Sequence, residues 1–220
     1  MHRNRAVPKL GIGLVLGVSL LSGCDSAEPV SMPPVEETRV TDLVPFSEGA
    51  EPAAGLRVID EVSARCEPSV LSPENQLARR CFTSETSVVL DPCFVPADPV
   101  DVPALEKPGE EPREVDTVAL CFDDPAQTEL TKVHVVTDNG VWPREPAPFD
   151  PHWFLELGDG TRCTKVFGVE EIRENLPLSY DCDDGTLYGS PDEEKPVWTV
   201  HHLAEGAETL RVAEVRTAWK

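Results

Sequence analysis

The sequence has few basic and few aromatic residues, and it has no long hydrophobic run. Its 220 residues include 19 Lys and Arg against 40 Asp and Glu, a formal net charge of −21. This excess of acid argues against a nucleic-acid partner, because phosphate binding needs clustered Lys and Arg. It argues equally against peripheral binding to anionic lipid through basic side chains. The longest apolar stretch, residues 10–21, has 12 residues, whereas a helix that spans a bilayer needs about 20.

The amino terminus combines a basic start, a short apolar stretch and a cysteine. Three basic side chains precede residues 10–21, which have the length of the apolar part of a secretory signal peptide. The next residues, Leu21-Ser22-Gly23-Cys24, resemble the lipobox of bacterial lipoproteins. In that family the cysteine thiol is alkylated with diacylglycerol, and the peptide is cut just before it. The resemblance implies that Cys24 is the lipidated first residue of the mature chain. A plain secretory signal with an incidental Cys24 is the alternative.

Composition divides the chain into three parts. Residues 1–23 are the predicted lipoprotein signal peptide, residues 24–54 a lipid anchor with a disordered tether, and residues 55–220 a single disulfide-framed, β-rich domain. The tether is rich in proline and acid, and Phe46 is its only aromatic residue. Such a segment buries too little apolar surface to offset the entropy of ordering it.

The rest of the sequence predicts mainly β structure with minor α. Runs of β-branched and apolar residues predict strands, and turn residues at 158–160 and 183–185 predict two tight connections. Residues 58–65 and 74–80 are the candidate helical segments, and residues 95–114 are expected to form a long surface loop. The architecture we expect is a small antiparallel sheet or sandwich, or a partly open barrel, stapled by disulfides. The predicted strands are residues 86–90, 115–122, 130–136, 153–157, 161–167, 178–182, 186–188, 197–202 and 210–219.

Six cysteines remain beyond the lipobox, namely Cys66, Cys81, Cys93, Cys121, Cys163 and Cys182. An even number in an exported chain indicates disulfides. A zinc site is the rival, but no cysteine or histidine pair stands at ligand spacing. A catalytic thiol would leave an odd number of cysteines to pair. Six cysteines allow 15 pairings. Local geometry favours Cys163–Cys182, which lie on neighbouring predicted strands, and Cys66–Cys81, which flank a short helical candidate. That leaves Cys93–Cys121.

The segments around these cysteines carry a resemblance. They include Arg80-Cys81-Phe82, Asp91-Pro92-Cys93-Phe94, Asp159-Gly160-Thr161-Arg162-Cys163, and Tyr180 with Cys182. From about Cys66 to Trp219 the chain is similar to a group of secreted proteins and lipoproteins of actinobacterial type. The resemblance implies an exported, cysteine-framed domain and no particular activity.

Residues that could carry chemistry are sparse. The mature chain has four histidines, and His201 and His202 are adjacent on a predicted strand, so they point to opposite faces and cannot chelate one ion together. The run from Asp181 to Gly185 is more typical of an acidic turn than of a calcium loop, because its glycine stands fifth and not sixth. We therefore predict no catalytic residue, no metal site and no cofactor. Trp142, in a loop, is the best candidate for contact with a ligand.

The function predicted from these features is that of a lipoprotein on the extracytoplasmic face of the cell membrane, held by the lipid on Cys24. We expect its domain to be a non-enzymatic binding or interaction module for an unknown protein or envelope ligand. The alternatives are a hydrolase directed at the cell wall or its glycans, and an accessory subunit of a membrane complex. The sequence leaves enzymatic activity open and favours its absence.

Overall fold

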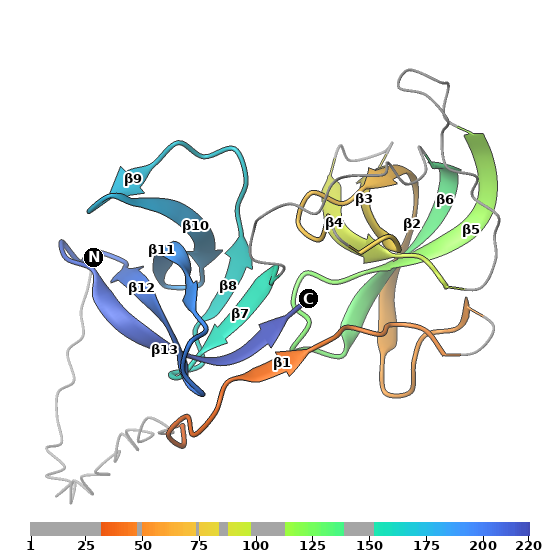
Figure 1. Ribbon diagram of the computed structural model, residues 1–220. Coiled ribbons are helices and arrows are strands. Elements are labelled where there is room, and N and C mark those ends of the chain that lie inside the picture. Colours follow the sequence, from red (N-terminus) through yellow and green to blue (C-terminus); the bar gives the residue numbers. More distant parts are fainter. Residues whose placement is uncertain (1–31, 48–49, 74, 84–87, 98–112, 139–151) are drawn as a thin grey trace, which may run out of the picture. The chain divides into compact units, whose positions relative to one another are not determined.

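A computed structural model describes residues 32–47, 50–73, 75–83, 88–97, 113–138 and 152–220. The chain divides into two units, Met1–Ser31 and the compact unit Met32–Lys220. Strands dominate the described residues, so the mainly-β class is confirmed (Figure 1). The strands are β1 (Arg39–Thr41), β2 (Arg57–Pro68), β3 (Ala78–Thr83), β4 (Val89–Phe94), β5 (Arg113–Cys121), β6 (Glu129–Asp138), β7 (Phe154–Leu157), β8 (Arg162–Lys165), β9 (Ile172–Arg173), β10 (Leu176–Cys182), β11 (Gly185–Asp192), β12 (Trp198–Ala204) and β13 (Arg211–Trp219).

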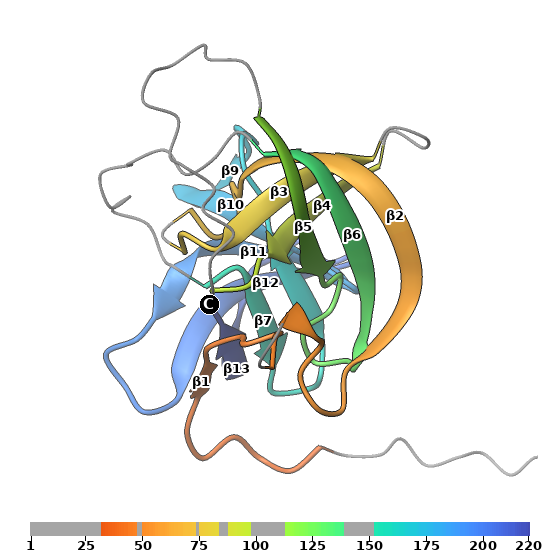
Figure 2. The ribbon, with the colours of Figure 1, turned by 90° about the vertical axis from the view of Figure 1, so that its right-hand side faces the viewer.

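Five consecutive strands, β2 to β6, form a closed barrel, which we call the β2–β6 barrel (Figure 2). Neighbouring strands are antiparallel except where β2 meets β6, and that pair is parallel. An odd number of strands that run alternately up and down must close on one parallel pair. The core holds small side chains, among them Ala64, Ala119 and Val133, together with four cysteines. A five-stranded barrel encloses little space, so alanine methyls and disulfide sulfurs suffice to fill it.

Six strands, β7, β8, β10, β11, β12 and β13, form a second closed ring, the β7–β13 barrel. All its neighbouring strands are antiparallel. The predicted turns at 158–160 and 183–185 join β7 to β8 and β10 to β11. The core has bulkier side chains than that of the first barrel, among them Leu155, Tyr180, Leu187 and Val215. The sequence predicted a small sheet or sandwich, or a partly open barrel; the structure has two barrels, and both are fully closed.

The predicted disordered tether, residues 24–54, is wrong for its described part. Strand β1 runs parallel to Thr217–Trp219 at the end of β13. The neighbouring strand β12 pairs only with the first half of β13, so this edge has free backbone groups that β1 satisfies. Leu43 and Phe46 then pack against a buried apolar cluster. Apolar side chains and an unpaired strand edge together offset the entropy of ordering this acidic, proline-rich segment.

The two helical segments expected from the sequence are also wrong. Residues 58–65 lie within β2, and the described part of residues 74–80 ends in β3. The first of them contains Val58, Ile59 and Val62, whose β-branched side chains favour an extended backbone. Within the part of the chain that the structure describes, no helix has the length and apolar character needed to cross a membrane.

An aromatic cluster draws side chains from both barrels. Phe94 of β4 lies 6.4 Å from the ring of Trp153, and Phe154 of β7 lies 5.5 Å from the ring of Trp219. All four residues are buried. Edge-to-face and tilted aromatic contacts of this kind add about 0.5–1.5 kcal/mol each beyond the area that they bury. Trp153 and Trp219 are therefore core residues.

Candidate functional site

A polar pocket of about 370 Å³ lies among strands β7 and β8, the β10–β11 turn and the loop after β5. This volume is in the lower part of the range of small-molecule sites, about 300–1,000 Å³. Four carboxylates and one guanidinium give the lining a formal charge of −3. This charge favours a ligand that is cationic or rich in hydrogen-bond donors. The lining residues are Asp123, Asp124, Gln127, Phe154, Arg162, Thr164, Asp181, Cys182 and Asp183.

An ion pair between Asp124 and Arg162 organises the pocket. Arg162 Nη1 donates to Asp124 Oδ2 at 2.7 Å, and Gln127 Nε2 donates to the same oxygen at 2.9 Å. The other carboxylate oxygen accepts the backbone N–H of Ala126 at 2.9 Å. The Asp124 side chain is 16% exposed and that of Arg162 is 39% exposed. The Asp124 carboxylate thus accepts three hydrogen bonds, and its bond with Arg162 links the loop after β5 to strand β8.

The remaining carboxylates of the pocket, those of Asp123, Asp181 and Asp183, belong to exposed residues. Asp183 sits in the tight turn between β10 and β11, and its backbone N–H donates to the carbonyl oxygen of Arg162 at 3.0 Å. Gly185 completes this turn with a φ of +141°, and a Cβ there would lie 2.1 Å from the carbonyl oxygen of Leu203. Only glycine fits this close approach. The acidic turn predicted from the sequence therefore lies beside the ion pair.

A buried histidine lies close to Asp184, the turn residue that follows Asp183. His202 is fully buried, whereas His201 is exposed. The Nε2 atom of His202 is 3.2 Å from Asp184 Oδ1, although the contact lacks the geometry of a hydrogen bond. Burial raises the pKa of the nearby Asp159 carboxyl, but hydrogen bonds from Thr161 and the charge of His202 together bring that pKa below its ordinary value.

Charged groups are also buried in the β2–β6 barrel. Arg79 Nε donates to Asp138 Oδ2 at 2.8 Å, and the two side chains are 2% and 0% exposed. The half-buried Asp91 accepts the Ser69 hydroxyl and the backbone N–H of Val70. Burial raises the pKa of the Asp91 carboxyl, since the charged form loses its water. These groups belong to the barrel and lie outside the pocket lining.

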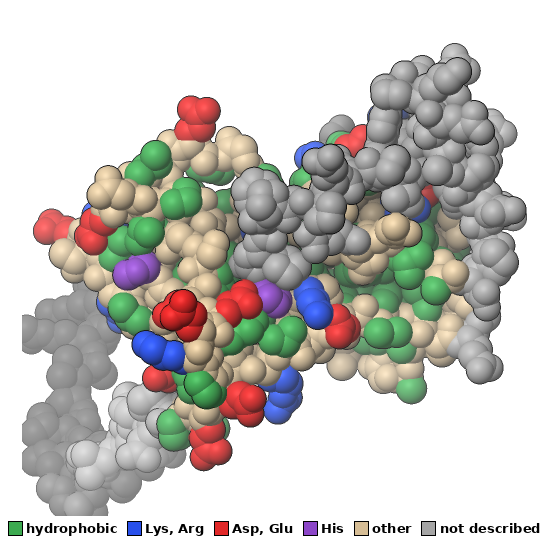
Figure 3. Space-filling view, in the orientation of Figure 1, with side chains coloured by type: hydrophobic (Ala, Val, Ile, Leu, Met, Phe, Trp, Pro, Cys, Tyr) green, Lys and Arg blue, Asp and Glu red, His purple; other side chains and the backbone are tan. Residues whose placement is uncertain are grey.

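The surface shown in Figure 3 carries charges of both signs. Over the β7–β13 barrel, acidic side chains are interspersed with basic ones, and the described residues form no continuous basic patch on this face. One exposed group of mixed sign is on β2 and β6, where Glu61 lies 3.1 Å from Lys132 and 2.6 Å from His134. Hydrogen bonds from these two side chains lower the pKa of the Glu61 carboxyl.

All six cysteines of the compact unit are paired as local spacing favoured. The disulfides are Cys66–Cys81, Cys93–Cys121 and Cys163–Cys182. Each joins residues directly opposite one another on neighbouring antiparallel strands. Of the other predicted site residues, Cys24 and Trp142 lie outside the described residues, as does the predicted signal peptide.

The sequence did not point to the pocket. Its ion pair joins residues 38 positions apart, and single aspartates in an acidic chain give no signal of their own. The one available clue was the pair of turn sequences around Gly160 and Gly185. Both turns contain aspartate, and both lie next to strands that the Cys163–Cys182 disulfide links. No family model, curated protein or solved structure matches this chain.

Proposed function

We propose that this chain is a lipoprotein of the extracytoplasmic face of the cell membrane, and that its compact unit is a non-enzymatic binding module. The observation that carries the location is the set of three disulfides. Such bonds persist in oxidising compartments outside the cytoplasm and are rare within it. The apolar stretch and lipobox at the amino terminus supply a route of export and an anchor.

The anchor would hold the folded unit close to the bilayer. Two acyl chains on Cys24 suffice for stable attachment, at about 0.8 kcal/mol per buried methylene. Only seven residues separate Cys24 from Met32, where the compact unit begins. They reach at most about 30 Å when fully extended. Cleavage before Cys24 removes three basic side chains, so the mature chain carries −24, and an anionic bilayer repels it at short range.

The pocket supports binding as the role of the compact unit. Its lining offers carboxylate, hydroxyl and amide groups, one guanidinium and one aromatic ring. A small polar molecule with many hydroxyl or amine donors satisfies such a lining, because each exposed carboxylate accepts several hydrogen bonds. Saccharide fragments of the cell envelope have this chemistry, and we propose them as the ligand class.

Replacement of Cys24 by alanine tests the location. The variant should leave the membrane fraction or accumulate as an uncleaved precursor, whereas the control Ser26→Ala should stay in the membrane fraction. A Cys24→Ala protein that fractionates and is cleaved like the parent contradicts the anchor.

Titration with a soluble disaccharide of glucosamine, which is rich in hydroxyl and amine donors, tests the binding role. We expect saturable binding that Asp181→Asn and Asp183→Asn each weaken, because both remove a charge from the pocket lining. The control Glu205→Gln changes an exposed carboxylate outside the lining and should leave the affinity unchanged. Equal affinities in all variants contradict the pocket as the site. Cleavage of the probe, detected by mass spectrometry, points instead to the glycan hydrolase.

A further inference from the structure

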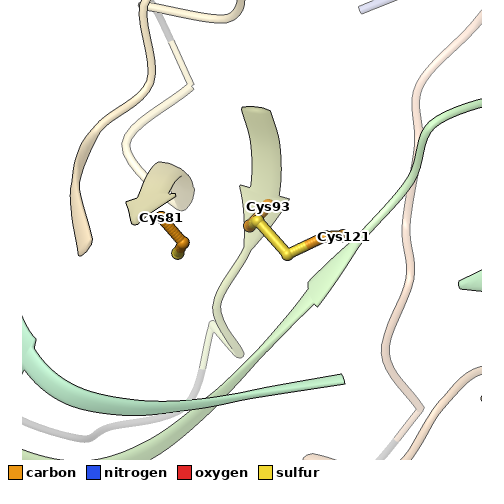
Figure 4. A group of neighbouring side chains, drawn as sticks. All are labelled: Cys81, Cys93 and Cys121. Atoms are coloured by element: carbon orange, nitrogen blue, oxygen red, sulfur yellow. A yellow bond between two sulfur atoms is a disulfide. The ribbon is translucent and has the colours of Figure 1, made fainter. Parts of the chain in front are cut away.

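Two disulfides meet in the core of the β2–β6 barrel. The Sγ atoms of Cys81, Cys93 and Cys121 all lie within 4.8 Å of one another (Figure 4). Cys93 and Cys121 are bonded to each other, and Cys81 is bonded to Cys66. The sulfur of Cys81 therefore stands within 4.8 Å of both sulfurs of the neighbouring disulfide.

Strand register produces this arrangement. Cys66 of β2 lies opposite Cys81 of β3, and Cys93 of β4 lies opposite Cys121 of β5. All four side chains belong to the same core and are between 0% and 3% exposed. The closed barrel thus brings together four consecutive cysteines of the sequence. We call Cys66, Cys81, Cys93 and Cys121 the four-cysteine cluster.

We propose that the four-cysteine cluster is a thiol–disulfide exchange centre, in which opening of either disulfide by a dithiol reductant leads to a Cys81–Cys93 bond. In the first step the dithiol is oxidised to its disulfide, and Cys66 and Cys81 become thiols. The Cys81 thiolate then attacks the sulfur of Cys93, and the Cys121 thiolate leaves and takes up a proton. The second step conserves the number of thiols and disulfides and needs no further oxidant.

Opening the other disulfide leads to the same product. When Cys93 and Cys121 become thiols, the Cys93 thiolate attacks Cys81, and Cys66 leaves. Cys81 and Cys93 are on the neighbouring strands β3 and β4, near a register shift, whereas Cys121 is on β5, which does not pair with β3. Cys81–Cys93 is therefore the favoured new bond. It leaves Cys66 and Cys121 as the two thiols of the partly reduced centre.

The third disulfide provides a matched control. Cys163 and Cys182 lie in the separate core of the β7–β13 barrel. Among the described residues, the group of three neighbouring sulfurs includes neither of them. A thiol freed at Cys163 has no second disulfide within reach and should stay where it is formed.

Single cysteine variants test the exchange without any added reductant. Purified Cys66→Ser protein is held at mildly alkaline pH, and the exchange is then quenched with acid. The protein is unfolded in a denaturant that contains N-ethylmaleimide, which labels free thiols, and it is digested without reduction. We expect a peptide linked through Cys81 and Cys93, with the maleimide on Cys121. Cys121→Ser should yield the same linked peptide, with the maleimide on Cys66. In the control, Cys182→Ser, the maleimide should remain on Cys163.

The location of the maleimide decides the outcome. A label confined to Cys81 in Cys66→Ser, with Cys93–Cys121 intact, overturns the proposal, as does a label confined to Cys93 in Cys121→Ser. Limited reduction of the parent protein with dithiothreitol tests the same point without a substitution that disturbs the core. Molecules that have lost one disulfide of the β2–β6 barrel should contain Cys81–Cys93, and the proposal fails if they retain only the original pairs.

Discussion

Replacement of Arg79 by methionine should destabilise the β2–β6 barrel strongly. The guanidinium donates to Asp138 at 2.8 Å and to the carbonyl oxygens of Gln76 and Ala78 at 2.7 and 3.2 Å. With the Arg79 and Asp138 side chains 2% and 0% exposed, water does not replace these bonds. Methionine fills a similar volume but removes the guanidinium that donates to the buried Asp138 carboxylate. Loss of one partner of such a pair costs about 3–5 kcal/mol, a large share of the ~5–15 kcal/mol that stabilises a typical domain.

Equilibrium unfolding in urea, with the disulfides intact, measures this cost. The control Arg57→Met removes an exposed pair with Glu129, whose partners are 65% and 41% exposed, and should cost about 1 kcal/mol or less. The double variant Arg79→Met with Asp138→Leu should cost much less than the sum of its single changes, since neither charge is left buried. A cost below about 1 kcal/mol for Arg79→Met, or an additive double variant, refutes this reasoning.

Three further predictions follow from other parts of the structure. Gly185→Ala should lower the free energy of unfolding in urea more than Gly206→Ala does, because only the Cβ at position 185 clashes with the backbone. The substitution at Gly206 should cost only about 1–2 kcal/mol, from its positive φ. The raised pKa of Asp91 means that the folded chain holds this proton to higher pH than the unfolded chain, so stability falls as pH rises through that range. The stability of Asp91→Asn relative to the parent protein should therefore increase as pH rises above the ordinary pKa of an aspartate, in the same assay. Replacement of both Cys163 and Cys182 by alanine opens a loop with a sequence separation of 19 and should cost about 3 kcal/mol in thermal or urea unfolding.

The covalent frame was predictable from the sequence because its information is local. Each disulfide joins strands that are close along the chain, with separations of 15, 28 and 19 residues. Parity and short spacing therefore favoured the three pairs that the structure contains. The strands of the β7–β13 barrel were equally accessible, since turn residues such as Gly160 and Gly185 mark their ends.

Features that depend on distant contacts were not predictable. Strand β1 forms because β13 has a free edge nearly 180 residues later, and composition alone favoured disorder there. The start of β2 has acidic residues that also suit a helix, and its extended form depends on parallel pairing with β6. Asp124 and Arg162 meet only when the chain is folded, so the ion pair of the pocket had no signal in the sequence.

The most direct test of the account is the mass of the amino-terminal peptide of the protein isolated from membranes. The account predicts a chain that begins at Cys24, with a diacylglycerol thioether on its sulfur. The resemblance of residues 21–24 to a lipobox implies both the cleavage point and the modified atom. A chain that begins at any other residue, or an unmodified Cys24 thiol in the mature protein, contradicts the proposed anchor and with it the proposed place of this module at the membrane.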